Sequence, residues 1–176
     1  MNIRSTRGKL ITVALAGLTA GALAAGASPV TAAASNGYVS GSGNFADDWN
    51  DEGTLSTTSY SNSGAACLWQ KVLIAEGYIL ESGADGYFGA ETKAATRFLQ
   101  VRWGLADSYA SADGKVGPNT FRRAQKNVTA TYIGSGDYRA LRYNGRVSTF
   151  KMTRADTGRY HMYEDGTASY TRNGCS

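Results

Sequence analysis

An eight-residue pattern occurs twice in the chain and constrains its fold more than any other feature. Residues 85–92 read DGYFGAET and residues 113–120 read DGKVGPNT, so both copies follow the pattern D-G-x-apolar-G-x-x-T, 28 residues apart. Asp-Gly is typical of a tight turn, because glycine adopts positive φ without steric cost. The second glycine stands where a helix can begin, and Pro118 suits the first helical position. The repeat therefore predicts two turns that each lead into a helix.

Apolar residues around the repeat recur at helical spacing. This spacing predicts helices over 65–76, 90–103 and 118–128, with Ser63 as the cap of the first helix and Gly77 as its stop. Three short helices can enclose a small core. We expect that core to contain Trp69, Phe98, Trp103 and Phe121, with Leu68, Leu73 and Val116.

This region resembles the peptidoglycan-binding-like module of bacterial cell-wall hydrolases. The motifs of that family occur in order over about residues 65–126, as Leu68-Trp69-Gln70-Lys71-Val72-Leu73, Gly77-Tyr78, the first repeat copy, 95–100, Gly104-Leu105 and the second copy. The chain departs from the family pattern at Trp69, Leu99 and Phe121, which are all apolar, and in a longer loop over 106–112. The resemblance implies a three-helix module that docks on peptidoglycan and targets a catalytic partner.

The resemblance also implies a ligand surface near the repeat. Peptidoglycan offers hydroxyls, amides, carboxylates and apolar sugar faces, which suit exposed hydroxyls, aromatic rings, a few charges and the free N–H groups of helix starts. The candidate ligand-binding residues are Asp85, Tyr87, Gly89, Thr92, Thr96, Arg97 and Gln100. The alternative is that these residues serve the turns and the core, and Asp85 and Asp113 in particular suit turns.

The N-terminus has the features of an export signal. Arg4, Arg7 and Lys9 precede an uncharged run from Leu10 to Ala25, and small residues follow. This order is typical of a secretory signal peptide over residues 1–34. Its removal, with its three basic residues, leaves 142 residues and lowers the formal net charge from +4 to +1. We expect a secreted monomer, extracellular or associated with the cell wall, with no membrane attachment after cleavage. Export and the low charge disfavour nucleic acid as a partner.

The segment over 35–64 differs from the rest in composition. It has no Lys or Arg, four acids, and many Ser, Gly, Asn and Thr residues. Such a composition offers little apolar surface for burial, so the segment is interpreted as a flexible acidic linker. Its acids lack the spacing of a calcium-binding loop.

The C-terminal segment over 129–176 has the pattern of strands. Asn144-Gly145 predicts a hairpin, and two further turn signals follow, so a short antiparallel β-meander of about four strands is expected. The fold class is therefore α+β, a small three-helix bundle followed by this β-rich extension. Arg139, Arg142, Arg146 and several tyrosines give the extension a basic, aromatic character. They form either a binding face for anionic wall polymers or a solvated face over half-buried tyrosines.

The chain holds two cysteines, Cys67 and Cys175, which pair most simply as a disulfide in an exported protein. The alternative is that one of them forms a nucleophilic pair with His161. A lone histidine cannot build a common zinc site, so neither a metal nor a cofactor is expected. Asp85 with Asp113, or Glu76 with Glu81, are the carboxylate pairs that a glycosidase would need, and neither pair has a supporting pattern.

These observations favour a secreted, non-catalytic protein that binds peptidoglycan, with no catalytic residues. One alternative is a small cell-wall hydrolase with a cryptic site in the C-terminal extension. Another is a secreted protein-interaction or inhibitor module.

Overall fold

The computed structural model describes residues 32–163 and 165–175. The predicted signal peptide therefore lies outside the described residues, apart from its last three, which begin the short helix α1 (Ala32–Ser35). No helix in the described ranges is both long and apolar enough to cross a membrane.

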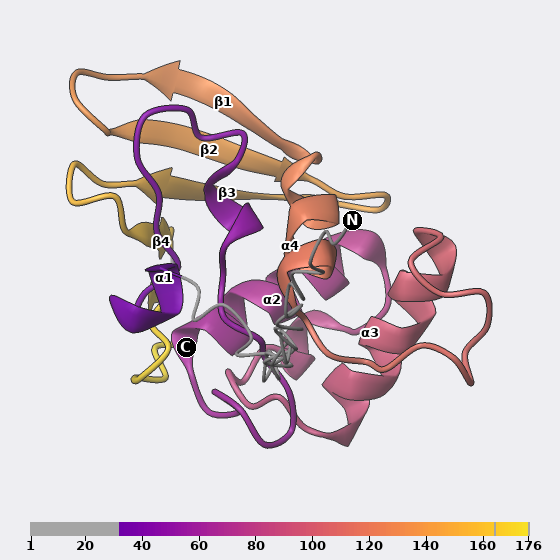
Figure 1. Ribbon diagram of the computed structural model, residues 1–176. Helices are drawn as coiled ribbons and strands as arrows, with labels where there is room; N and C mark the ends of the chain where they lie inside the picture. Colours follow the sequence, from indigo (N-terminus) through magenta and orange to yellow (C-terminus); the bar gives the residue numbers. More distant parts are fainter. Residues whose placement is uncertain (1–31, 164, 176) are drawn as a thin grey trace, which may run out of the picture.

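Three longer helices and one antiparallel sheet make up the fold, which confirms the predicted α+β class (Figure 1). The helices are α2 (Gly64–Glu76), α3 (Ala90–Arg102) and α4 (Pro118–Gln125), with 3-10 turns η1 (Asp48–Asn50) and η2 (Glu81–Gly83). The strands are β1 (Val128–Ile133), β2 (Arg139–Asn144), β3 (Thr149–Arg154), β4 (Tyr160–Met162) and β5 (Gly166–Thr167). They pair in sequence order, so the sheet has five strands where about four were expected.

The helix ends follow from the residues predicted to form them. The hydroxyl oxygen of Ser63 accepts a hydrogen bond from the Ala66 N–H at the start of α2, and Gly77 ends that helix at a φ of 81°. Gly89 and Gly117 are the N-caps of α3 and α4, and Pro118 is the first residue of α4. The repeat therefore does start two helices.

Helix α2 lies at the centre of the core, with Trp69 in edge contact with Trp103 and Phe121. The prediction was wrong for one core residue, because Phe98 is 54% exposed in the structure. Helix α3 buries the face that carries Thr92, Thr96 and Leu99, so Phe98 points away from the core. Its ring lies 4.6 Å from that of Tyr109 instead.

The segment over 35–64 is not a flexible linker, so that prediction is wrong. Val39, Trp49 and Leu55 are fully buried in the common core. The backbone of the segment also pairs with both repeat copies, because the Phe88 N–H donates to the Ser61 carbonyl at 2.6 Å and Leu55 exchanges two hydrogen bonds with Val116. Figure 1 shows this indigo and purple segment passing between the sheet and the helices. Its few apolar residues are widely spaced, so the polar average composition of the segment gives no sign that they are buried.

A buried ion pair joins this segment to the sheet. Arg154 is fully buried, and its Nη1 lies 2.9 and 2.7 Å from the two carboxylate oxygens of Asp48. The Tyr160 hydroxyl donates to the same carboxylate at 2.6 Å. The other guanidinium nitrogens donate to the carbonyls of Asp137 and Gly43. Every nitrogen of this guanidinium is thus hydrogen-bonded, as a buried charge requires.

A second acid of the segment, Glu52, is buried without a cation. Its carboxylate accepts hydrogen bonds from the Tyr170 hydroxyl at 2.6 Å and from the Ser40 N–H at 2.9 Å. Because burial disfavours the charged form, the pKa of Glu52 rises from 4.5 to about 8. At neutral pH this carboxyl is therefore largely protonated in the folded chain.

Trp49→Ala should lower the free energy of unfolding by about 3–5 kcal/mol, because it removes a fully buried ring from the core. Urea unfolding followed by circular dichroism measures this change. Phe98→Ala is the matched control, because that ring is half exposed and should cost much less. Equal stability of the Trp49→Ala variant and the native chain would mean that the segment does not pack as described.

Glu52 should make stability fall as the pH rises. Between pH 4.5 and about 8, the folded chain holds a proton on Glu52 that the unfolded chain releases. Unfolding then becomes easier by about 1.4 kcal/mol per pH unit. Glu52→Gln stays neutral, so its stability relative to the native chain should increase from about pH 5 to about pH 8 in urea titrations. Glu91→Gln, which replaces an exposed carboxylate in the same way, is the matched control.

Candidate functional site

Each repeat copy forms a turn that is held by one buried glutamine. In the first copy, the Gln70 Nε2 donates to the Asp85 carboxylate at 2.8 Å and to the Thr92 hydroxyl at 3.2 Å. The Gln70 Oε1 accepts from the Gly86 N–H at 2.7 Å. The side-chain amide thus ties helix α2 to the Asp-Gly turn and to the start of α3.

The second copy repeats this arrangement atom for atom. The Gln100 Nε2 donates to the Asp113 carboxylate at 2.8 Å and to the Thr120 hydroxyl at 3.3 Å, and its Oε1 accepts from the Gly114 N–H at 2.9 Å. Here the glutamine ties α3 to the turn and to the start of α4. The hydrogen bonds that hold the two turns are therefore equivalent, and any difference between the copies must come from the residues around them.

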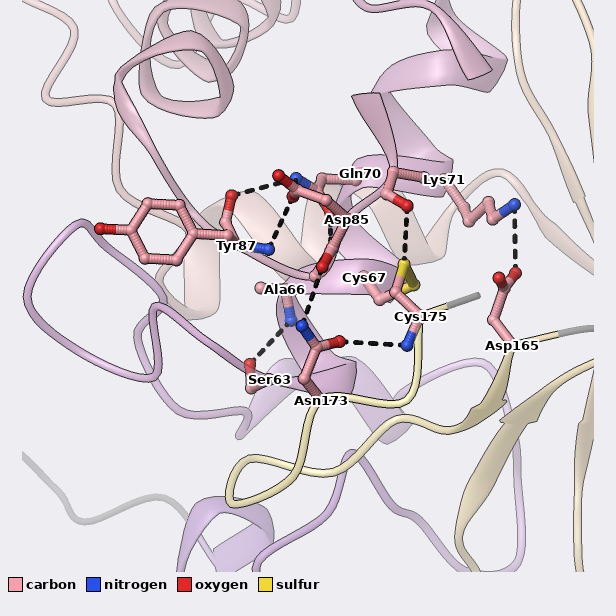
Figure 2. The surroundings of a disulfide bond; sticks show 12 residues. Ser63, Ala66, Cys67, Gln70, Lys71, Asp85, Tyr87, Asp165, Asn173 and Cys175 are labelled. Carbon is pink, nitrogen blue, oxygen red and sulfur yellow. Dashed lines mark hydrogen bonds and ion pairs between the residues drawn. A yellow bond between two sulfur atoms is a disulfide. The ribbon is translucent and has the colours of Figure 1, made fainter. Parts of the chain in front are cut away.

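The C-terminal tail covers the first turn. The Asn173 Nδ2 donates to the Asp85 carbonyl and to the Asn62 Oδ1, both at 2.8 Å. A disulfide between Cys67 and Cys175 fixes the tail to α2, which confirms the predicted pair. Figure 2 shows Asn173 beside Asp85 and next to this disulfide. The tail thus packs on one side of the first turn, while Asp85 and Tyr87 remain exposed.

The second turn opens into a cavity of about 610 Å³. The cavity lies between the end of α3, the loop over 105–113 and the first turn of α4. Four basic side chains line it, and one acid is also present. These residues are Lys115, Arg122, Arg123 and Lys126, with Asp113. We call this hollow the basic cavity.

The four cations of the basic cavity have no acidic partner. No carboxylate of the described residues lies within 4.0 Å of them, and the Asp113 Oδ1 already accepts from Gln100 and from the Lys115 N–H. Arg123 lies over the Trp103 ring at 4.8 Å, and the Arg122 Nε donates to the Asn50 Oδ1 at 3.3 Å. Such contacts orient the guanidinium groups without neutralising them. The start of α4, with its free N–H groups, adds further attraction for an anion.

The repeat shows that this charge is specific to the second copy. The residues that match the four cations in the first copy are Tyr87, Ala94, Ala95 and Phe98, in the order of Lys115, Arg122, Arg123 and Lys126. None of the four carries a charge. The two copies therefore share turn chemistry and differ in surface chemistry.

Of the seven predicted ligand residues, Gln100 alone lines the basic cavity. Thr92 and Thr96 are buried, and Thr96 accepts from the Trp69 indole at 2.8 Å and donates to the Thr92 carbonyl. The remaining residues lie outside the cavity lining. Asp85, Tyr87 and Gly89 surround the first turn, and Arg97 lies 5.1 Å from the centre of the Tyr109 ring.

The glutamates, the histidine and the cysteines that were weighed as catalytic candidates are engaged in other contacts. Glu76 is buried and binds Arg102, Asn127 and Tyr143, whereas Glu81 binds Lys71. The His161 Nδ1 is hydrogen-bonded to the Thr167 hydroxyl at 2.9 Å. Cys67 and Cys175 lie near Asp165, but their sulfurs are joined to each other and offer neither a thiolate nucleophile nor a thiolate metal ligand.

Similarity to known proteins adds nothing to this geometry. No family model matches the chain, and no curated protein or solved structure matches it significantly. The chemistry of the basic cavity is therefore the main guide to function. A hollow of this size, with four cations and a helix start, suits a ligand that carries carboxylate or phosphate groups.

The cations of the basic cavity were missed from the sequence, although a signal for them exists. Comparison of the two copies at positions 115, 122, 123 and 126 shows a cation at each position of the second copy and none in the first. Three of the seven predicted ligand residues, Asp85, Gly89 and Thr92, are instead residues that the copies share. Shared residues such as Asp85 and Thr92 hold the turns.

Replacing both cysteines by serine should lower the free energy of unfolding by up to about 4.7 kcal/mol, because the disulfide closes a loop of 108 residues. The tail would then also release the first turn. Thermal unfolding of the Cys67→Ser/Cys175→Ser variant measures the stability. Ser169→Ala, which alters the same tail but keeps the disulfide, is the control. A double variant as stable as the control would contradict this role of the disulfide.

Proposed function

We propose that this chain is a secreted, non-catalytic protein that binds bacterial peptidoglycan through the basic cavity. The observation that carries the proposal is the group of four cations beside the second repeat turn, none of which has a carboxylate within 4.0 Å among the described residues. Peptide stems of peptidoglycan carry carboxylates, which charged hydrogen bonds from Arg and Lys can hold. The resemblance of residues 65–126 to the peptidoglycan-binding-like family supports the same ligand.

On this proposal the helices over 65–128 form the wall-binding module, and residues 129–176 form its β-rich extension. Overall charge does not explain binding, because the chain without its signal has a net charge of only +1. The charge is instead concentrated at the basic cavity, where four cations face one carboxylate that is already hydrogen-bonded. Binding should therefore be local and sensitive to salt.

The chain should pellet with purified, insoluble peptidoglycan, and Arg122→Gln/Lys126→Gln should weaken pelleting at least about tenfold, because two charged contacts are lost. Arg142→Gln/Arg172→Gln removes the same charge outside the cavity and should leave pelleting unchanged. Sedimentation over a range of protein concentrations measures both effects. Equal loss in the two variants would show that binding is a general effect of charge.

The same experiment separates the alternatives. Release of soluble fragments from the peptidoglycan would contradict a non-catalytic role and support a small cell-wall hydrolase. Absence of pelleting by the native chain would overturn the proposal and favour a secreted protein-interaction or inhibitor module.

A further inference from the structure

A second cleft, of about 440 Å³, lies between α2, η2 and strands β3 and β4. Its size is within the usual range of small-molecule sites, roughly 300–1,000 Å³. Apolar side chains line part of it, namely Ile74, Phe150 and Met162. The Phe150 ring is fixed because it stacks on that of Tyr143, with centroids 5.3 Å apart. The cleft shares no lining residue with the basic cavity.

Charged groups occupy one end of this cleft. The Lys71 Nζ lies 2.8 Å from the Glu81 carboxylate and 3.1 Å from that of Asp165. Lys71 and Asp165 are largely buried, whereas the Glu81 side chain is 70% exposed. An ammonium group has three donors, of which these two contacts use two. The trio thus presents fixed polar groups to the cleft.

Tyr163 forms another part of the lining and is 78% exposed. This exposed ring is accessible to a ligand in the cleft and offers it an apolar face for stacking. The lining therefore combines an open aromatic ring with an apolar floor and carboxylates, which is a different chemistry from that of the basic cavity.

We propose that this cleft binds a neutral pyranose sugar. One face of a pyranose ring is formed by C–H groups that pack on an aromatic ring such as Tyr163, while its hydroxyls donate to carboxylates such as Glu81. A polyanion fits less well, because Lys71 and Lys151 in the lining are balanced by Glu81 and Asp165. A purely apolar ligand would remove water from these charged groups without forming hydrogen bonds to them. A ligand with apolar faces and neutral hydroxyls satisfies both parts of the lining.

This sugar site is separate from the peptidoglycan proposal, and a soluble probe tests it alone. The neutral oligosaccharides tetra-N-acetylchitotetraose and cellotetraose carry no carboxylate and so make no ion pair with the basic cavity. At least one of them should bind the full chain in calorimetric or NMR titrations. Tyr163→Ala should weaken that binding at least about fivefold through loss of stacking, whereas Tyr163→Phe, which keeps the ring, should retain most of it.

Two further variants sharpen the test. Glu81→Gln should weaken sugar binding several-fold through loss of a charged acceptor, and its exposed position keeps the fold intact. Tyr132→Ala is the control, because it removes another largely exposed tyrosine, 62% exposed and outside the cleft, and it should leave binding unchanged. Arg122→Gln/Lys126→Gln should also leave sugar binding unchanged, so failure of one proposal does not decide the other.

The proposal would be overturned if neither oligosaccharide bound at concentrations up to about 10 mM. It would also be overturned if Tyr163→Ala bound as tightly as the native chain, or if Tyr132→Ala lost as much affinity as Tyr163→Ala.

Discussion

The buried pair of Asp48 and Arg154 is the constraint on which the rest of the architecture depends. It joins the segment before the helices to the third strand of the sheet, across 106 residues of chain. Removal of either partner would leave a charge in the core, which costs far more than the pair itself contributes. The pair thereby fixes how the sheet sits beside the helices. Asp48 thus holds the N-terminal segment against the sheet, and the second carboxylate near this guanidinium in the described ranges, that of Asp137, lies farther away at 3.6 Å.

The two repeat copies use the same glutamine-centred hydrogen bonds but carry different side chains around them. A single glutamine in each copy satisfies the Asp-Gly turn and the helix start, so both turns are rigid before any ligand arrives. The disulfide-bound tail packs on the first turn, whereas the four cations of the basic cavity lie beside the second. A rigid frame with a local cluster of charge is well suited to orient an anionic group.

The sequence predicted the helices, their caps and the disulfide, because these depend on local signals such as Ser63, Gly77 and the repeat itself. It did not predict the role of residues 35–64, because their burial depends on contacts over 100 residues away, as between Asp48 and Arg154. Phe98 was misplaced because the face of α3 that is buried depends on its packing partners. Gln100 was among the predicted ligand residues, but the four cations of the basic cavity were not, because only a comparison of the two copies at those four positions singles them out.

Contacts between the two ends of the chain also determine when it can fold. Val39 donates its backbone N–H to Ala168, and Tyr170 donates to Gly37, so an early segment needs residues near the C-terminus to complete its hydrogen bonds. The disulfide of Cys67 likewise cannot form until Cys175 is present. A chain that emerges N-terminus first, from a ribosome or through a membrane channel, therefore cannot close its core until nearly all of it has emerged.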